Sequence, residues 1–480
     1  MSEKRQFKAI KGTRDILPPD SAVWNWFEQT ARQVFESYGF RDIRLPIFEE
    51  TELFARAVGA ETDIVGKEMF SFFSQFTSDE RFEDLEQRLH EELARDPGEE
   101  KIRALVDSND PQIPGTLSQA AAKVRRSGES LTLRPEATAG SVRAYIEHGM
   151  HTLPGNQTLY YIGPMFRRER PQKGRYRQFY QVGAEVLGPS DAPGIDAEIL
   201  EMLLALFNRV GLANTKLYIN SIGCKDCRPA YVELLREELR KVKDQLGADS
   251  QRRIETNTLR VLDSKLPEEQ PIIEKLPRIS EHLCAACRDH FEKLKIELAL
   301  REIVYEENWR LVRGLDYYTR TTFEVTAAGL GSQNAVCCGG RYDGLVEMLG
   351  GPAGVKGIGF AIGTDRAILS IQEGGNLPRL AGLDVFIAWM GAQAYPAAVR
   401  IAQKIRARGF SAELPPEEMK FRKSLGLADK LGARFALILG EDEAATSTYT
   451  LKRLADAHQE KLGEAALLDT LEAERKGTRA

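Results

Sequence analysis

The spacing of apolar residues predicts helices and short strands along most of the chain. From Trp24 to Tyr38 apolar side chains recur at helical spacing, and Gly39 ends that predicted helix. Helical patterns return over Thr138–Glu147 and Asp196–Val210. Strand-like runs fall at residues 130–136, 158–169, 177–188, 216–223 and 321–327. Strands and helices segregated in this way predict an α+β fold with a mainly antiparallel sheet.

Two mainly helical segments interrupt the strand-rich pattern. Residues 71–128 contain an amphipathic helix behind a Thr77-x-x-Glu80 capping box and then become polar. Residues 221–303 are charged and amphipathic, with a cysteine pair near each end. We interpret both segments as helical insertions into one core. The parts of that core are expected at residues 1–70, 129–220 and 304–375.

The pattern changes again after the stretch Gly374–Gly382, which has the composition of a linker. Strand, helix, strand, helix and strand patterns follow one another over residues 383–440. This alternation predicts a small parallel or mixed sheet, so residues 376–480 are expected to form a separate α/β domain. The tail, residues 471–480, is expected to fray.

Composition and charge limit the classes of function. No apolar run approaches the about 20 residues needed to cross a bilayer, and the first residues lack the apolar centre of a secretory signal. The sequence therefore predicts a cytoplasmic protein without a membrane partner. The net charge is −5, so binding of nucleic acid requires a local basic surface.

The segment Met165–Phe179 is the densest candidate for chemistry, because its flanks alternate like a hairpin around a cationic run. The cationic residues are Arg167, Arg168, Arg170, Lys173, Arg175 and Arg177. Such a run is usually a solvated loop between strands, and that alternative stays open. The preference for arginine over lysine favours phosphate binding, because a planar guanidinium binds phosphate oxygens in pairs.

Polar residues on both sides of this segment suggest a pocket. Glu136 and Thr138 open a predicted helix, so they either cap it, with Thr138 as the N-cap, or offer a carboxylate to an ammonium group. Gln181, Gly183 and Glu185 lie at period two on one face of a strand. A polar face with a glycine predicts the floor of a pocket that a ligand approaches closely.

The glycine-rich region 337–363 matches neither a dinucleotide-binding nor a P-loop pattern. Gly357, Gly359 and Gly363 are expected to thin a strand, so that a flat base lies against the backbone near Arg366. The adjacent Cys337 and Cys338 are interpreted as structural.

Four cysteines form two Cys-x-x-Cys pairs, Cys224 with Cys227 and Cys284 with Cys287. Four thiolates would complete a tetrahedral structural zinc site. The separation between the pairs, residues 228–283, exceeds the usual zinc-ribbon spacing. Zinc and free thiols therefore remain open alternatives.

Several stretches resemble the motifs of one enzyme family. Residues 38–59, 165–179 and 357–369 resemble motifs 1, 2 and 3 of class II aminoacyl-tRNA synthetases. The segments "KGTRDILP" at 11–18, "RGLDYYT" at 313–319 and "GGRYDGL" at 339–345 are similar to those of histidyl-tRNA synthetases. The resemblance runs from Lys11 to about Gly440. It implies a class II antiparallel catalytic core with helical insertions, followed by an anticodon-binding domain at 376–480.

The resemblance also implies an activity and a set of site residues. A histidyl-tRNA synthetase uses ATP and Mg²⁺ to form histidyl-adenylate, then transfers histidine to the 3′ end of histidine tRNA, and motif 1 forms its homodimer. The implied catalytic groups are Arg167 and Arg313. The implied histidine-binding residues are Glu136, Ala137, Thr138, Gln181, Glu185, Tyr317 and Tyr318. The implied ATP-binding residues are Arg167, Glu169, Arg175 and Arg366. The implied contacts to the tRNA acceptor end are Gln172, Lys173 and Arg177.

The chain departs from the family pattern at few positions. Ala137 stands where bacterial members usually have glycine, and residues 71–128 are longer than usual. The alternative is the synthetase-like regulatory subunit of ATP phosphoribosyltransferase, which shares the class II fold. That subunit generally lacks the anticodon domain and parts of the histidine signature, both of which the sequence contains.

Overall fold

The computed structural model describes residues 7–59, 62, 64–73, 130–212, 214–327, 334–378 and 382–479. The chain divides into two compact units, Met1–Leu377 and Pro378–Ala480. Nearly all of the helical insertion expected at 71–128 lies outside the described residues. Within the described part of the chain, no helix has both the length and the apolar character needed to cross a membrane.

The unit Met1–Leu377 is built on a sheet with eight strands among the described residues. In order across the sheet, these are β1 (Arg41–Asp42), β5 (Gln157–Phe166), β6 (Gln178–Gly188), β11 (Lys356–Gly363), β10 (Ala335–Arg341), β9 (Thr319–Thr326), β7 (Lys216–Ser221) and β8 (Glu306–Glu307). The pairs from β5 to β7 are antiparallel, and only the short outer strands β1 and β8 pair in parallel. The prediction of an α+β fold on a mainly antiparallel sheet is confirmed.

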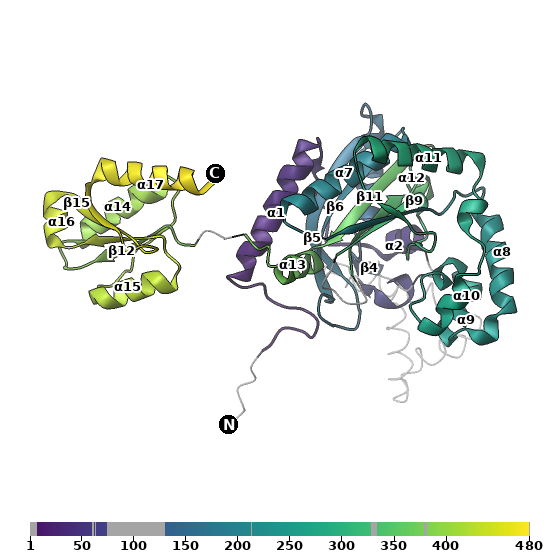
Figure 1. Ribbon diagram of the computed structural model, residues 1–480, viewed down its shortest axis with the longest axis horizontal. Coiled ribbons are helices and arrows are strands. Elements are labelled where there is room, and N and C mark those ends of the chain that lie inside the picture. Colours follow the sequence, from purple (N-terminus) through teal and green to yellow (C-terminus); the bar gives the residue numbers. More distant parts are fainter. Residues whose placement is uncertain are drawn as a thin grey trace, which may run out of the picture. The chain divides into compact units, whose positions relative to one another are not determined.

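Helices α1 (Asp20–Ser37) and α7 (Pro193–Arg209) pack together over one face of this sheet (Figure 1). The ring of Phe35 lies 5.4 Å from that of Tyr160 on β5 and 6.0 Å from that of Phe360 on β11. Because successive strand residues point to opposite faces, Tyr161 and Gln181 point the other way. Helix α6 (Thr138–Glu147) contacts β6 and α2 (Thr51–Val58), and it has the bounds that the sequence predicts.

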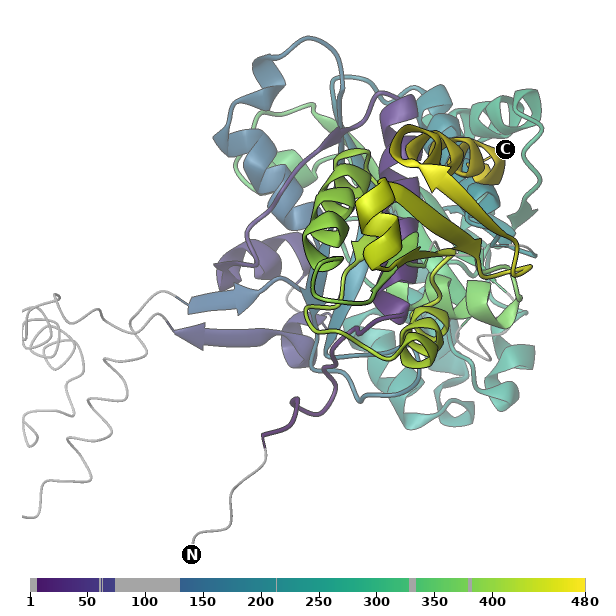
Figure 2. The ribbon, with the colours of Figure 1, turned by 90° about the vertical axis from the view of Figure 1, so that its left-hand side faces the viewer.

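A second, three-stranded sheet lies beside α2. Its order is β2 (Phe48–Glu50), β4 (Ser130–Leu133) and β3 (Phe70–Phe73), and both pairs are antiparallel. Figure 2 shows β3 in purple and β4 in blue running side by side. A π-helical turn, Ile64–Glu68, precedes β3.

Residues 221–303 are mainly helical, as predicted (Figure 1). The helices are α8 (Arg228–Lys241), α9 (Ala248–Thr256), α10 (Gln270–Ile273) and α11 (Ala285–Leu300), with short 3₁₀ turns at Lys243–Gln245, Thr258–Val261, Pro267–Glu269 and Ile279–Glu281. The buried faces of α8, α9 and α10 belong to one apolar cluster with Phe54, Tyr317 and Tyr318, and α11 contributes Cys287 to it. The same unit also contains the 3₁₀ turn Met150–Thr152, α12 (Leu345–Met348) and α13 (Thr364–Glu373).

The unit Pro378–Ala480 has a five-stranded mixed sheet among its described residues. In chain order its elements are β12 (Val385–Trp389), α14 (Tyr395–Ala407), β13 (Ala412–Glu413), α15 (Phe421–Lys430), β14 (Phe435–Leu439), α16 (Glu441–Thr446), β15 (Thr448–Arg453), β16 (Gln459–Gly463) and α17 (Glu464–Arg479). Strands β13, β12 and β14 pair in parallel, as the strand–helix alternation predicts. Helix α17 continues to Arg479, and Leu471 on it is buried; the expectation that residues 471–480 fray stays a prediction.

Candidate active site

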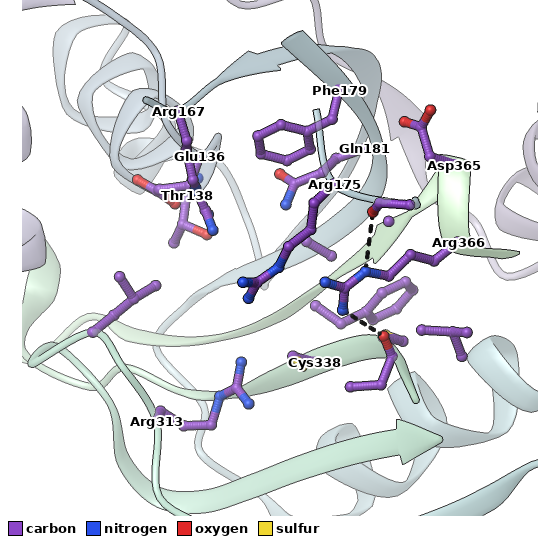
Figure 3. Close-up of a pocket in the computed structure, with 18 of the residues that line it drawn as sticks. Glu136, Thr138, Arg167, Arg175, Phe179, Gln181, Arg313, Cys338, Asp365 and Arg366 are labelled. Atoms are coloured by element: carbon purple, nitrogen blue, oxygen red, sulfur yellow. Dashed lines mark hydrogen bonds between the residues drawn. The ribbon is translucent and has the colours of Figure 1, made fainter. Parts of the chain in front are cut away.

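A cavity of about 230 Å³ opens on the face of the sheet opposite α1, and four separate parts of the chain line it (Figure 3). These are the start of α6, the β5–β6 hairpin, the segment before β9, and the stretch from β10 to α13. A neighbouring cavity of about 410 Å³ is lined by several of the same charged residues and by the insertion helix α9. Both cavities therefore lie where the core sheet meets its loops.

Arg167 and Arg313 line both cavities although 146 sequence positions separate them. Arg167 follows β5, and its Nε donates a 2.9 Å hydrogen bond to the carbonyl of Pro135. Arg313 precedes β9, and its Nη1 lies 3.5 Å from Glu324 Oε2. Burial acts to lower the pKa of Arg313, but its interactions with Cys338, Tyr318 and Glu324 together raise the pKa by more. The net pKa is raised, so the guanidinium stays charged.

Glu136 holds the start of α6, and its carboxylate faces the cavity. That carboxylate accepts hydrogen bonds from the N–H groups of Thr138 (2.7 Å) and Ala139 (2.9 Å). The cap is thus the Glu136 carboxylate; the alternative with Thr138 as N-cap is wrong, because the N-cap position is Ala137. Burial raises the pKa of Glu136, and the two N–H bonds oppose that rise.

Gln181 and Glu185 lie on the same face of β6, as predicted, but at different depths. Gln181 lines the cavity, and its Oε1 is buried without a hydrogen-bond partner among the described residues. Glu185 lies beneath, where its carboxylate accepts hydrogen bonds from Thr138 Oγ1 (2.8 Å) and the Tyr342 hydroxyl (2.5 Å). Burial raises the pKa of Glu185 to about 8. Ala137 also lies below the surface, packed with Tyr161 and Met165.

The interpretation of Gly183, Gly357 and Gly359 as places where a ligand approaches the backbone is wrong. A Cβ at Gly183 would lie 2.3 Å from the Tyr161 hydroxyl, and one at Gly357 would lie 2.1 Å from the Tyr342 ring. A Cβ at Gly359 would meet the Glu185 carboxylate. Side chains of the protein already fill these spaces, whereas Gly363 does line the cavity.

Tyr317 and Tyr318 form one wall of the cavity and are 4% and 6% exposed. Their ring centroids lie 4.6 Å apart, and the Tyr342 ring packs edge-on against Tyr317 at 5.8 Å. Burial raises the pKa of Tyr318 to about 12, so its hydroxyl is neutral at physiological pH and can donate a hydrogen bond.

Arginines occupy the other end of the cavity. The Arg366 side chain donates to the carbonyls of Gly174 (3.3 Å) and Ala335 (3.1 Å), which fixes it beside the loop after β5. Figure 3 shows Arg175, Arg313 and Arg366 pointing into the same space. Glu169 lies 3.1 Å from Arg175, so a carboxylate is present among these cations.

The three residues assigned to tRNA contact lie on the loop between β5 and β6 and do not line the cavities described above. Lys173 Nζ donates to Glu373 (2.8 Å), and Gln172 pairs with Arg175 through the backbone. Arg177 binds Lys11, its Nη1 lying 3.1 Å from that carbonyl. Their roles remain predictions.

Sequence reasoning missed several residues of the site. Arg14 Nη2 lies 2.8 Å from Asp365 Oδ1, and Asp365 also accepts from the Tyr180 N–H. Asp365, Tyr161 and Cys338 line the cavity. The segment "KGTRD" was a signal for Arg14, but a partner 351 residues away could not be inferred from it. The interpretation of Cys338 as purely structural is incomplete, since it lies between Arg313 and Glu324.

The four paired cysteines lie apart from the residues that line either cavity. The sulfur atoms of Cys224, Cys227, Cys284 and Cys287 all lie within 4.8 Å of one another.

Comparisons with known proteins identify the family of the chain. The family model of histidyl-tRNA synthetase matches residues 81–367, and that of an anticodon binding domain matches residues 384–474. The histidine–tRNA ligase of Koribacter versatilis is 48% identical over 96% of this chain and 95% of its own length. The histidine–tRNA ligase of Solibacter usitatus is 47% identical over 97% and 99%.

Solved structures give the same result. Apo histidyl-tRNA synthetase of S. aureus matches with a TM-score of 0.72 and 32% identity, covering 97% of this chain and all of that one. A Bacillus halodurans chain described as an ATP phosphoribosyltransferase regulatory subunit/histidyl-tRNA synthetase has a TM-score of 0.56 and 18% identity over 91% of this chain and 99% of its own, which is a likeness of fold. The regulatory-subunit alternative is thus less supported. From the matched family model and the near full-length relatives, this chain belongs to the histidyl-tRNA synthetase family.

Proposed function

We propose that the chain activates L-histidine with ATP in the cavity of about 230 Å³ and then transfers it to the 3′ end of histidine tRNA. The observation that supports this best is the pair of guanidinium groups, Arg167 and Arg313, which are 20% and 15% exposed and lie on the walls of one cavity. Adenylate formation brings together two anions, the carboxylate of histidine and the α-phosphate of ATP. Fixed cations reduce that repulsion and stabilise the charge of the transition state.

The chemical step is an in-line displacement. A carboxylate oxygen of histidine forms a bond to the α-phosphorus, and the bond from that phosphorus to the bridging oxygen of pyrophosphate breaks. Arg167 would hold the α-phosphate, Arg313 would contact both the phosphate and the carboxylate, and Arg366 would hold the rest of ATP. An arginine keeps its proton throughout, so Arg313 acts by charge and not as a base.

A divalent metal is usual in class II synthetases, and ATP is their substrate. Mg²⁺ is commonly held by one or two carboxylates together with phosphates of the substrate. Glu169 and Glu324 both line the larger cavity and fit that donor set. Mg²⁺ bound there would neutralise charge on the leaving pyrophosphate.

Histidine would be recognised at the opposite end. The Glu136 carboxylate uses two of its acceptor positions for backbone N–H groups, which leaves positions for the substrate ammonium. The unpartnered Oε1 of Gln181 needs a donor, which the ligand would supply. Tyr317 and Tyr318 would close over the imidazole, while Glu185 would orient Thr138 from below. A site that hydrogen-bonds its substrate rejects amino acids lacking those groups by about 10⁴-fold.

Transfer requires tRNA, and we assign its binding to two regions. The matched anticodon binding domain, residues 384–474, would bind the anticodon arm. The loop residues Gln172, Lys173 and Arg177 would approach the acceptor end. Because Lys173 pairs with exposed Glu373, tRNA phosphates would have to compete for that cation.

We also propose a homodimer formed through motif 1. Large apolar side chains of this region are exposed: Ile47 by 46%, Phe48 by 52% and the neighbouring Phe72 by 42%. Phe48 and Phe72 contact each other with ring centroids 6.3 Å apart, which makes a continuous apolar surface. Exposed apolar patches commonly mark protein interfaces.

Histidine-dependent exchange between ATP and pyrophosphate tests the activation step. Exchange that requires histidine and is not supported by other amino acids is the expected result. Exchange with a different amino acid would refute the histidine assignment. Absence of any exchange, together with stimulation of an ATP phosphoribosyltransferase, would instead favour the regulatory-subunit alternative.

A further inference from the structure

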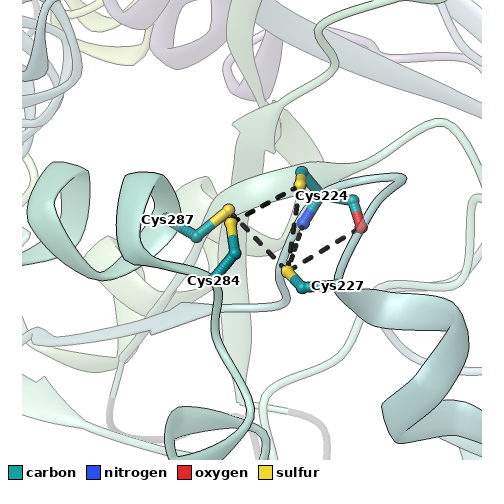
Figure 4. Close-up of side chains that lie close together, drawn as sticks. All are labelled: Cys224, Cys227, Cys284 and Cys287. Atoms are coloured by element: carbon teal, nitrogen blue, oxygen red, sulfur yellow. Dashed lines mark hydrogen bonds between the residues drawn. The ribbon is translucent and has the colours of Figure 1, made fainter.

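Two cysteine pairs from distant parts of the sequence meet in one cluster (Figure 4). Cys224 and Cys227 lie in the loop between β7 and α8, and Cys284 and Cys287 lie at the start of α11. The separations between sulfur atoms are 3.8 Å for Cys224–Cys227 and 3.9 Å for both Cys224–Cys284 and Cys227–Cys287. The cluster therefore joins the first and last parts of the helical insertion.

These separations match the geometry of a single tetrahedral ion. A zinc–thiolate bond of about 2.3 Å places tetrahedral ligands about 3.8 Å apart. A disulfide needs about 2.05 Å, so the pairs are not disulfides. All four sulfur atoms lie within 4.8 Å of one another, which leaves room for one ion at their centre and not for a cluster of several.

Packing alone does not account for the cluster. Free cysteines behave as small apolar residues and are usually buried, but only Cys287 is buried here, and the other three are half-buried. The Cys224 N–H points at Cys227 Sγ at 3.3 Å, an arrangement that stabilises a thiolate. Gly223 adopts φ +70°, and a Cβ there would lie 2.9 Å from that sulfur, so the loop is folded tightly around it.

Cationic groups also lie close to the cluster. Arg228 interacts electrostatically with Cys224 and Cys227, and Arg320 does so with Cys287. Four thiolates around a divalent ion carry a net charge of −2, which Arg228 would partly offset; Arg320 is already paired with Asp191 at 2.6 Å. Four sulfur ligands in a tetrahedron select zinc or iron, and a set without an open position is typical of structural zinc.

We propose that Cys224, Cys227, Cys284 and Cys287 bind one structural zinc ion that closes the helical insertion onto the central sheet and holds the tyrosine segment of the active site. The second part follows from three hydrogen bonds beside the cluster. The Ile222 N–H donates to the Arg320 carbonyl (2.8 Å), the Arg320 N–H donates to the Gly223 carbonyl (2.8 Å), and Arg228 Nη1 donates to the Tyr318 carbonyl (2.5 Å). The loop that contains Cys224 is thereby bonded directly to the chain after Tyr317.

Metal content of the full-length, tag-free protein is the first test. Mass spectrometry should find about one zinc per chain, and a thiol reagent should release it as four cysteines react. The double variant Cys224→Ser, Cys284→Ser should lose the metal. The matched control Cys337→Ser removes a buried cysteine outside the cluster and should keep the metal. Zinc-free wild-type protein, iron in place of zinc, or full zinc content in the double variant would overturn the proposal.

A measurement on the wild type keeps the test valid if the double variant fails to fold. Replacing the ion with Co²⁺ should give the visible spectrum of a tetrahedral tetrathiolate site; a weak octahedral spectrum would refute it. The proposal that the ion holds the tyrosine segment in place is tested by removing the metal and measuring pyrophosphate exchange. KM for histidine should rise more than KM for ATP, because Tyr317 and Tyr318 line the cavity and the proposed function, on which this part rests, assigns them to histidine. Equal changes, or none, would refute the link to the tyrosine segment.

Discussion

Replacing Arg313 with alanine separates transition-state stabilisation from substrate binding. The Arg313 side chain is 15% exposed, and its nearest carboxylate, on Glu324, is 27% exposed and 3.5 Å away. Because Glu324 keeps access to water, loss of this pair should lower the free energy of unfolding by only about 1 kcal/mol or less. The variant should therefore fold, and its defect should appear in catalysis.

The size of that defect follows from the charge that is removed. A unit charge about 4 Å from the reacting phosphate, at an effective dielectric constant of about 20, contributes about 4 kcal/mol. Removal of a single preorganised donor from comparable sites costs about 3–4 kcal/mol, or 10²–10³ in kcat. We expect Arg313→Ala to slow adenylate formation by a factor in this range. Because Glu136 and Gln181 would hold the amino end of histidine, its Kd should rise by less than about tenfold, or 1.4 kcal/mol.

The assay combines pyrophosphate exchange with calorimetric measurement of histidine binding. Arg301→Ala is a matched control, because Arg301 is 26% exposed and pairs with Glu201 at 3.0 Å outside both cavities. It should keep exchange within about twofold. Arg313→Lys, which keeps the charge but not the planar fork, should recover part of the rate.

Equal losses in exchange and in histidine affinity would refute this reasoning. Arg313 would then bind the ground state and the transition state equally well, and the proposed electrostatic role would be wrong. A rate within threefold of wild type would show that Arg167 alone supplies the necessary charge.

Three further predictions concern stability and assembly. Burial raises the pKa of Glu185 to about 8 from an ordinary value of 4.5, so the folded chain keeps a proton that the unfolded chain has lost. The free energy of unfolding should therefore fall as pH rises through that interval, and Glu185→Gln should flatten this part of a urea-denaturation profile; an unchanged slope would contradict it. Phe48→Glu should convert a dimer into a monomer by light scattering, and a dimeric variant would refute the motif 1 interface. Arg14→Ala leaves the buried carboxylate of Asp365 without its ion pair and should cost about 1–2 kcal/mol in thermal unfolding, which an unchanged Tm would disprove.

The local pattern of apolar and polar residues predicted those helices and strands in which buried positions recur at the regular spacing of a helix or a strand. Helix Thr138–Glu147 and the strands of the central hairpin are examples. Strand β10 contains two adjacent glycines, Gly339 and Gly340, and packing explains why glycine stands inside a strand there. A Cβ at Gly339 would lie 2.4 Å from the Phe323 ring, so glycine occurs there because a neighbouring strand is crowded. The sequence analysis did not predict strands β15 and β16. On β16 the residues are exposed or half-buried and only one of them is apolar, so the sequence shows no clear strand pattern there.

In the candidate site, too, some features could be predicted from local sequence and others could not. The residue types of the cavity, above all Arg167 and Arg313, could be chosen from motifs, because each motif is continuous in sequence. The contacts between residues that are distant in sequence could not be predicted in this way. Arg14 with Asp365 and Tyr342 with Glu185 are contacts over 351 and 157 positions, and a single sequence contains no signal for them. The glycines beside Glu185 and Tyr342 were misinterpreted for this reason.

The histidine signature is recognisable in isolation, but its position depends on chain that lies elsewhere. The Asp316 N–H donates to the Val58 carbonyl in α2, and a Cβ at Gly59 would collide with the Asp316 side chain. Arg228 of the insertion donates to the carbonyl of Tyr318. Motif 1 and the insertion thus hold opposite ends of the same tyrosine pair. Since about 1 Å of displacement in such a site can cost 10²-fold in rate, we expect changes in either region to impair the proposed histidine pocket even though neither lines it with the groups that would react.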